Sequence, residues 1–172
     1  MAGSAPSALQ LYNKLPVTGF EVIFNEMKMA PAPTTLHQIL LSDLHVLLYN
    51  FLKNANSGIV IPSPVDVYLE SDESGIQPDL LVILNKHKYR IKTEGIYGPP
   101  DLIIEILSGD KTYDTQRKRS LYEKAGVREY FMIDPENKTT TLLTLNHSGI
   151  YEQTYEEKGL LRSAILNCNI GF

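Results

Sequence analysis

The sequence predicts an α/β fold in which a central mixed β-sheet is flanked by α-helices. Two runs, residues 79–84 and 101–107, are dense in leucine and β-branched residues, which is typical of sheet strands buried on both faces. Residues 36–53 and 114–125 carry apolar side chains at helical spacing and predict helices before and after these strands. Strands interleaved with helices form a sheet with helices packed on it.

The first third of the chain is predicted to hold a tail, a hairpin and a long helix. Residues 1–10 are small and polar and offer no apolar face to bury, so we expect a flexible tail followed by a single domain over residues 11–172. Residues 20–30 alternate weakly and predict a short hairpin that turns at Asn25–Glu26. Thr34 or Thr35 is expected to cap the helix that follows.

The remaining elements follow from apolar runs and turn signals. Residues 59–62 and 65–70 predict strands, residues 71–75 a polar turn, and residues 85–100 a polar excursion between the two central strands. Gly126 is expected to end the 114–125 helix. Residues 129–135 predict another buried strand, which forms a hairpin with residues 139–145. Residues 151–172 carry too weak a pattern to assign.

Composition excludes several classes of protein. Hydrophobic residues make up 43% and charged residues 21%, which is ordinary for a globular domain and unlike a disordered or fibrous chain. No stretch reaches the roughly 18 apolar residues that span a bilayer, and the first ten residues lack a secretory pattern, so we expect a cytoplasmic protein. Cys168 is the only cysteine, which excludes an internal disulfide. The net charge of −4 argues against binding nucleic acid through bulk electrostatics, although a bound divalent ion reverses the local field.

The strand at residues 101–107 carries a carboxylate among aliphatic side chains. Successive side chains of a strand point to opposite faces, so Asp101, Glu105 and Leu107 share one face. A carboxylate in this setting is costly to bury unless it is paired, hydrogen-bonded or bound to a metal. Asp79 opens the other central strand directly after Pro78, and pairing of the two strands would bring Asp79 and Glu105 within reach of one cation. Such oxygen ligands hold Mg²⁺ or Mn²⁺ beside phosphate, which favours phosphodiester hydrolysis.

The helix at residues 114–125 adds a lysine to this acidic pair. Lys118 shares a face with Leu121, Tyr122 and Ala125, and this apolar face is expected to pack on the sheet. Lys124 belongs to the opposite, solvent-facing side. An inward lysine beside two strand carboxylates can orient a water molecule or neutralise charge that develops on a phosphate.

Structural explanations compete with each of these assignments. Asp79 after proline is also typical of a turn. Glu105 and Lys118 can form a structural ion pair without any catalytic role. Asp114 and Lys118 are separated by four residues and can form a salt bridge on the helix surface.

Other candidate features are weaker. His37 and His45 have no third ligand near them in sequence, so a zinc site is not predicted, and Tyr122 is expected to lie in the core. Residues 86–92 mix cations with Tyr89, a composition that suits contact with a DNA backbone but also suits a solvated loop. No glycine-rich phosphate loop, nucleophile elbow or zinc-protease helix motif is present.

In combination, these segments resemble a known family. The matching pieces, from about Phe20 to Leu145, are FEVIFNEMKMAPAP, SPVDVYL, QPDLLVI, PPDLIIEILS and AGVREYFMIDP. They are similar to a large bacterial family of restriction-endonuclease-like proteins, abundant in cyanobacteria, within the PD-(D/E)XK nuclease superfamily. The resemblance implies a restriction-endonuclease-like fold, with Asp79 and Glu105 as metal ligands and Lys118 as the catalytic lysine.

The chain departs from the superfamily pattern at one position. The usual lysine two residues after the strand glutamate is replaced by Leu107, so the resemblance implies that the lysine has moved to the following helix. Gln77 and Glu26 also match the family pattern and are expected to support the site.

The sequence therefore predicts a Mg²⁺- or Mn²⁺-dependent endonuclease that hydrolyses DNA. A homodimer suits this interpretation, because cutting two strands often uses two-fold symmetry. Two alternatives stay open: a catalytically silent binding or assembly protein with the same fold, and a metal-dependent hydrolase of RNA or of another phosphate ester.

Overall fold

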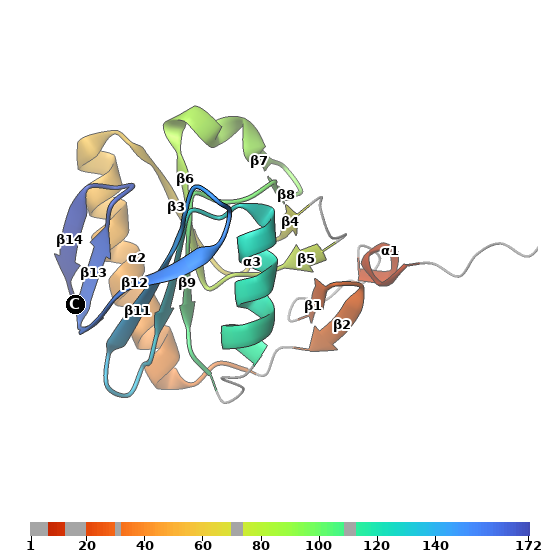
Figure 1. Cartoon of the computed structure of the whole chain (residues 1–172), viewed down its shortest axis with the longest axis horizontal. Helices are drawn as coiled ribbons and strands as arrows, with labels where there is room; N and C mark the ends of the chain where they lie inside the picture. Colours follow the sequence, from red (N-terminus) through yellow and green to blue (C-terminus); the bar gives the residue numbers. More distant parts are fainter. Residues whose placement is uncertain (1–6, 13–19, 30–31, 70–73, 109–112) are drawn as a thin grey trace, which may run out of the picture.

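The computed structural model describes residues 7–12, 20–29, 32–69, 74–108 and 113–172, and Figure 1 follows the chain through them. Its helices and helical turns are α1 (Ala8–Tyr12), α2 (Thr35–Ala55), η2 (Asn85–Arg90), η3 (Tyr113–Lys118) and α3 (Arg119–Ala125). Its strands are β1 (Phe20–Ile23), β2 (Glu26–Met29), β3 (Gly58–Pro62), β4 (Val67–Leu69), β5 (Ser74–Ile76), β6 (Leu80–Leu84), β7 (Ile91–Lys92), β8 (Gly95–Tyr97), β9 (Leu102–Ile106), β10 (Glu129–Ile133), β11 (Thr139–Leu145), β12 (Tyr151–Lys158), β13 (Leu160–Ser163) and β14 (Cys168–Gly171).

The strands form three sheets. One six-stranded sheet has the order β12-β11-β10-β9-β6-β3, and its only parallel pair is β9 with β10. A second six-stranded sheet has the order β2-β1-β5-β4-β8-β7, and β13 pairs with β14 in a separate hairpin. We refer to the first as the central sheet and to the second as the side sheet.

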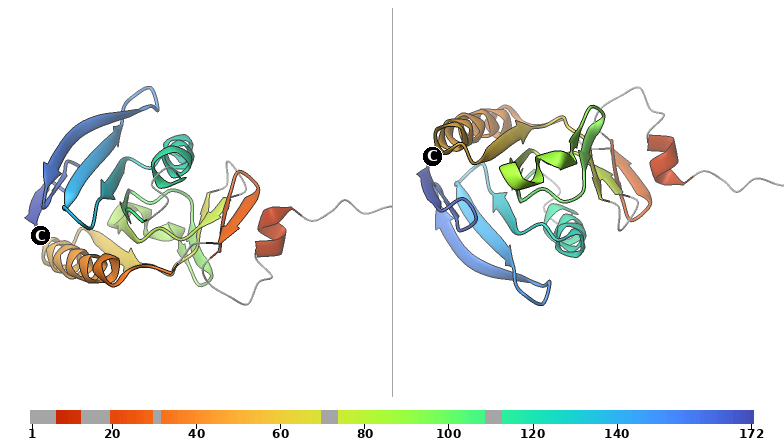
Figure 2. Two further views of the ribbon diagram at one scale, coloured as in Figure 1. Left: turned by 90° about the horizontal axis from the view of Figure 1, so that it is seen from below. Right: turned by 90° about the horizontal axis from the view of Figure 1, so that it is seen from above.

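Two helices cover opposite faces of the central sheet, as Figure 2 shows. On one face, α2 packs its buried leucines against Leu80, Leu102 and Ile104. On the other face, Leu121 and Tyr122 of α3 pack with the neighbouring strand residues, which point the opposite way, and with apolar residues of the side sheet. The alternation along β6 and β9 therefore feeds two apolar cores, as expected for strands buried on both faces.

The long helix forms where the sequence predicts it. Thr34 is the N-cap, and its hydroxyl accepts a hydrogen bond from the His37 N–H at 3.2 Å. Asn56, in the left-handed conformation, ends the helix and donates its N–H to the carbonyls of Leu52 and Lys53. The six buried positions of α2 recur at helical spacing: His37, Leu40, Leu41, Leu44, Leu48 and Leu52.

The expected mixed α/β architecture is confirmed, but the prediction of one sheet is wrong. The side sheet takes in the predicted hairpin of β1 and β2 and the predicted strand β4. It also contains β5, β7 and β8, which lie in segments predicted to be a polar turn and a polar excursion. These strands have only two or three residues each, too few for an alternating pattern to stand out.

The second predicted helix is divided into two parts. Residues 113–118 form a π-helical turn, and α3 continues from Arg119 to Ala125. Gly126, at φ 85°, caps α3 and donates its N–H to the carbonyls of Tyr122 and Glu123, as expected of a C-terminal glycine. The unassigned C-terminal segment forms β12, β13 and β14.

The predicted N-terminal tail overlaps α1, and residues 1–6 lie outside the described residues. The division into a tail and a single domain from residue 11 stays a prediction. No helix in the described ranges is both long and apolar enough to cross a membrane.

Candidate functional site

The strands β6 and β9 bring Asp79 and Glu105 to the same end of the central sheet. They are antiparallel neighbours, with Leu80 opposite Ile104. Asp79 and Glu105 are the next residues beyond this last pair, one on each chain segment, so both lie at the same end of the two strands. The predicted pairing of the two strands is therefore confirmed.

A buried lysine lies between two buried carboxylates next to this end of the sheet. The ammonium nitrogen of Lys118 is 3.0 Å from Oε1 of Glu105 and 3.1 Å from Oε1 of Glu21 on β1. All three residues are at most 5% exposed. The inward direction predicted for Lys118 is confirmed, and β1 adds a second glutamate that the sequence did not single out.

Tyr122 completes the surroundings of Glu105. Its hydroxyl donates a hydrogen bond to Oε1 of Glu105 at 2.6 Å, so this oxygen is held by two donors. Burial, together with the Glu105 carboxylate, raises the pKa of the Tyr122 hydroxyl well above its ordinary value of 10.0. The hydroxyl therefore stays protonated and keeps donating. Tyr122 lies in the core as predicted, and it also fixes the orientation of Glu105.

Asp79 is fixed by contacts with the helix α2 and with β9. Its Oδ2 lies 3.1 Å from Nε2 of His37 and accepts the Ile106 N–H at 2.8 Å. Both hydrogen bonds that the Asp79 carboxylate makes within the described residues are on Oδ2, and the side chain keeps 18% of its surface exposed. The Oδ1 atom is thus left for another ligand.

Gln77 connects the acidic residues to the side sheet. Its N–H donates to Oε1 of Glu21 at 3.2 Å, and its side-chain amide donates to Oδ1 of Asp66 at 2.8 Å. The support expected from Gln77 is therefore visible as contacts. Glu26 lies elsewhere: its side chain is 68% exposed and forms a 2.6 Å salt bridge with Arg117 on the surface.

Asp101, which shares a strand face with Glu105, belongs to the opposite end of β9. Its carboxylate accepts the Leu84 N–H at 2.8 Å and lies 2.8 Å from Nδ1 of His87 and 3.0 Å from Arg128. These contacts tie η2 and the start of β10 to the sheet. Asp101 is therefore structural, and the two carboxylates of the strand have separate surroundings.

Asp79 and Glu105 are the residues that would hold a divalent ion. The described ranges contain no group of three or more His, Cys, Asp or Glu side chains arranged to hold a metal. However, Mg²⁺ is usually bound by only one or two carboxylates, with water and substrate phosphate as the other ligands. The two residues lie at the same end of neighbouring strands, and their carboxylate oxygens, including the open Oδ1 of Asp79, are of the kind that a hard cation bound in this way prefers.

Sequence reasoning missed Glu21 and His37 as neighbours of the site. Both make contacts that join distant parts of the chain, since His37 and Asp79 are 42 residues apart. A signal was present at Glu21, which is a carboxylate in the apolar run FEVIF, as Glu105 is in LIIEIL. The side chain of Asp114 is outside the described residues, so its predicted salt bridge with Lys118 stays untested.

Comparison with known proteins agrees with this description. The family model Uma2, described as "Putative restriction endonuclease", matches residues 9–167. A crystal structure of "a putative nuclease belonging to DUF820" from Anabaena variabilis superposes with a TM-score of 0.78 at 16% identity. The superposition covers 97% of this chain and 95% of that one, so the two share a fold. A search of curated proteins finds no match. Because the family model spans most of the chain, this protein belongs to the Uma2 family of restriction-endonuclease-like proteins.

Proposed function

We propose that this protein is a metal-dependent endonuclease that hydrolyses DNA phosphodiester bonds, with the restriction-endonuclease-like fold of the PD-(D/E)XK superfamily. The observation that carries the proposal is the buried contact of Lys118 with Glu105, on the strand next to Asp79. A charged lysine and carboxylates inside a protein are costly unless their interactions compensate for lost hydration. Membership of the Uma2 family supports the reaction class.

Each residue has a separate role in this proposal. Asp79 and Glu105 hold one Mg²⁺ or Mn²⁺ ion, and Tyr122 and His37 keep the two carboxylates oriented. The bound ion would supply Lewis-acid stabilisation of the phosphate and a more acidic water. Lys118 adds a positive charge that favours the increased negative charge on the phosphate, and Glu21 keeps its ammonium in position. In the reaction, a water oxygen bonds to phosphorus and the water loses one proton, one bridging P–O bond breaks, and the leaving oxygen takes up one proton, so the proton count is unchanged.

The second donor to Glu105, the Tyr122 hydroxyl, favours a catalytically silent protein instead. Oε1 of Glu105 already receives donors from Lys118 and Tyr122, an arrangement that also suits a purely structural ion pair. A metal-dependent hydrolase of RNA or of another phosphate ester is a further alternative, since the overall charge of −4 does not select DNA. A cytoplasmic location and a homodimer stay predictions. The molecular mass of the purified protein in solution tests whether it is a homodimer.

A cleavage assay separates these functions. Purified protein is incubated with plasmid DNA, linear DNA and RNA in the presence of Mg²⁺, Mn²⁺ or a chelator. The proposal expects metal-dependent cutting of DNA that is lost in Asp79→Asn and in Glu105→Gln, and retained in Asp43→Asn, an exposed aspartate on α2. Absence of cutting on every substrate supports the silent protein, and cutting of RNA alone supports the other hydrolase. Cutting that survives in both site variants contradicts the proposed site.

A further inference from the structure

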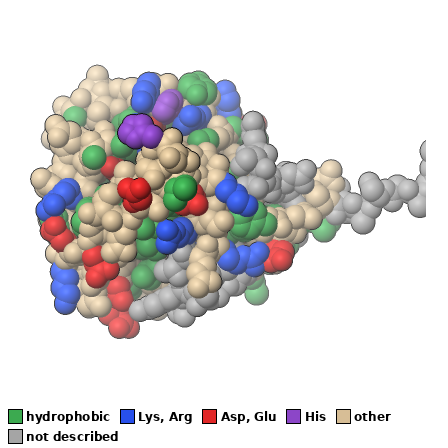
Figure 3. All heavy atoms as spheres, in the orientation of Figure 1, with side chains coloured by type: hydrophobic (Ala, Val, Ile, Leu, Met, Phe, Trp, Pro, Cys, Tyr) green, Lys and Arg blue, Asp and Glu red, His purple; other side chains and the backbone are tan. Residues whose placement is uncertain are grey.

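One short segment of this chain is rich in positive charge. Residues 86–92, KHKYRIK, contain four of the 16 Lys and Arg residues and no Asp or Glu. Because the whole chain has a net charge of −4, the rest of it has a net charge of −8. Figure 3 shows Lys, Arg and His side chains gathered at the upper end of the molecule, where Figure 1 places the connection from β6 to β7. Acidic side chains lie mainly on the lower left of that view.

This segment has regular secondary structure and is held to the rest of the fold by hydrogen bonds. It forms η2 and β7, and His87 in its middle lies 2.8 Å from the buried carboxylate of Asp101. The Arg90 guanidinium donates to the Pro99 carbonyl, and this ties the far end of the segment to the chain after β8. The backbone is therefore anchored at both positions.

The lysines of the segment point into solvent. Lys86, Lys88 and Lys92 are exposed, and none of them forms a salt bridge with a carboxylate in the described ranges. Three exposed ammonium groups without a salt bridge in these ranges, on an anchored backbone, form a pattern of donors that suits a row of phosphates, although Glu94 lies beside Lys92 in the lining of the adjoining hollow.

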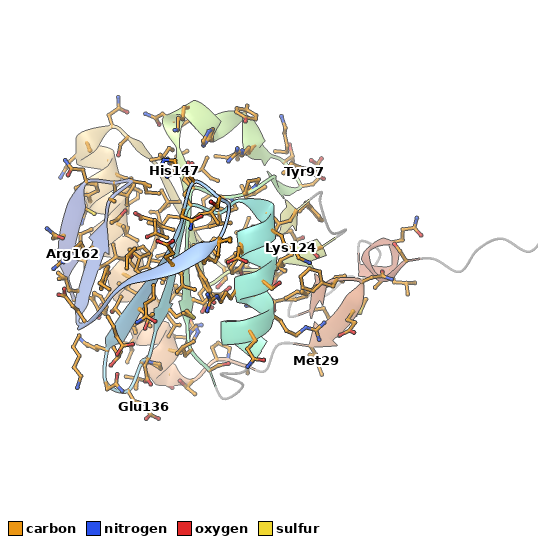
Figure 4. The ribbon with its side chains drawn as sticks, in the orientation of Figure 1. Met29, Tyr97, Lys124, Glu136, His147 and Arg162 are labelled. Atoms are coloured by element: carbon orange, nitrogen blue, oxygen red, sulfur yellow. The ribbon has the colours of Figure 1, made fainter. Side chains whose placement is uncertain are left out.

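Two exposed tyrosines accompany these cations. Tyr89 is 65% exposed and Tyr97 is 40% exposed, and the Tyr97 ring lies 4.9 Å from the ring of Tyr68. Figure 4 shows Tyr97, the last residue of β8, at the periphery of the molecule. Residues 91–94 and Tyr97 line a hollow of about 610 Å³. Aromatic rings interleaved with cations are the means by which proteins bind single-stranded nucleic acid, since every base offers a face for stacking.

A groove borders this surface. A second hollow, of about 280 Å³, has residues 61 and 64–66 on one side and residues 91–96 on the other. The first side adjoins the site, because Ser63 donates its N–H to the Asp79 carbonyl at 2.9 Å. Asp66 in the same wall accepts the side-chain amide of Gln77, which contacts Glu21 through its N–H.

We infer that η2 and the β7–β8 hairpin form a docking surface for a single DNA strand that runs along this groove to the site. Lys86, Lys88 and Lys92 contact its phosphates, and Tyr89 and Tyr97 stack on unpaired bases. The inference rests on the proposed function for the identity of the nucleic acid. Its test needs binding only, so a failure of cleavage leaves it intact.

The test measures the binding of short, fluorescently labelled single-stranded and duplex DNA by fluorescence anisotropy. The measurements are made in the presence of a chelator and over a range of salt concentrations. The triple variant Lys86→Gln/Lys88→Gln/Lys92→Gln should bind single-stranded DNA at least about tenfold more weakly. The slope of log affinity against log salt should fall by about 2, because each phosphate contact contributes roughly 0.7 for a single strand. The matched triple variant Lys53→Gln/Lys138→Gln/Lys158→Gln has the same net charge and should bind like the wild type.

The tyrosines are tested separately. Tyr89→Ala and Tyr97→Ala should each weaken binding of the single strand at least about fivefold, with a smaller effect on duplex DNA. Tyr49→Ala, on the exposed side of α2, is the control, and thermal unfolding checks that each variant is folded. Equal loss in both lysine triple variants, or binding that none of these changes weakens, overturns the inference. A preference for duplex DNA that is insensitive to Tyr89 and Tyr97 overturns the single-strand assignment.

Discussion

The ammonium nitrogen of Lys118 lies 3.0 Å from Oε1 of Glu105, and both side chains are buried. The first residue ends the π-helical turn η3 and the second lies within the central strand β9, so the contact joins the start of the helix to the sheet. Loss of a buried pair of this kind should affect both the rate of cleavage and the free energy of unfolding, and the two can be measured independently.

Replacing Lys118 by methionine should impair both cleavage and folding. The change keeps an unbranched side chain that is one atom shorter but leaves the Glu105 and Glu21 carboxylates without their shared cation, which should cost about 3–5 kcal/mol of unfolding free energy. Urea unfolding measures this loss, and the double variant Lys118→Met/Glu105→Gln should recover part of it.

Under conditions where Lys118→Met is folded, its cleavage rate should fall at least about a hundredfold, because a positive charge near the phosphate is lost. Lys124→Met removes an exposed lysine of the same helix, labelled in Figure 4, and should keep both activity and stability. Full activity of folded Lys118→Met would exclude a catalytic role for the lysine.

Glu21→Gln should slow cleavage about tenfold or more while the protein stays folded. The glutamine carbonyl can still accept the Gln77 N–H, but it no longer provides the negative charge that holds Lys118. The control is Glu26→Gln on the neighbouring strand, whose side chain is 68% exposed and pairs with Arg117 on the surface. An equal effect of the two substitutions on the rate of cleavage would remove Glu21 from the site.

Tyr122→Phe should destabilise the fold by about 1.5–3 kcal/mol, the usual range for a hydrogen bond to a charged group. Urea unfolding gives the loss, and Tyr89→Phe, at an exposed hydroxyl, should cause none. An unchanged unfolding free energy for Tyr122→Phe would mean that Lys118 alone satisfies Oε1 of Glu105.

Glu129 predicts a dependence of stability on pH. Burial raises the pKa of this carboxyl above its ordinary value of 4.5, although Ser163 and the N–H groups of Ala164 and Ile165 donate to it. A raised pKa in the folded state means that stability is lost as the pH rises from 4.5 through the folded value. The unfolding free energy of Glu129→Gln, measured relative to wild type, should therefore increase with pH over this interval. Urea unfolding at several pH values measures the difference in unfolding free energy between the variant and the wild type. A difference that stays constant from pH 4 to neutrality would contradict this prediction.

The fold could be predicted from the sequence where apolar runs are long. The helix α2 and the strands β6, β9 and β10 follow from such runs, because each buries several side chains in the two cores. The side sheet was not predicted as a separate sheet, because β5, β7 and β8 are very short. The strand β12 was not predicted, because it carries charged and polar side chains at mostly exposed positions. Its sequence therefore lacks the alternation of apolar and polar residues that indicates a strand.

The candidate site could be predicted only in part, for a related reason. Glu105 and Lys118 stand out because each is a charged residue on an otherwise apolar face, and both are buried as expected. His37 did not stand out, since a histidine at one end of a long helix has many uses and its contact with Asp79 depends on how α2 packs against the sheet. Residue patterns predict which face a side chain takes, whereas pairing across the core depends on tertiary packing.

Calorimetric titration of the purified protein with Mn²⁺ most directly tests the proposal that Asp79 and Glu105 are the metal ligands. We predict that the wild type and Asp43→Asn bind the ion, and that Asp79→Asn and Glu105→Gln each lose binding while they stay folded. Binding that is unchanged in both site variants, or no binding to folded wild-type protein with or without DNA, would contradict the assignment of Asp79 and Glu105 as the metal ligands.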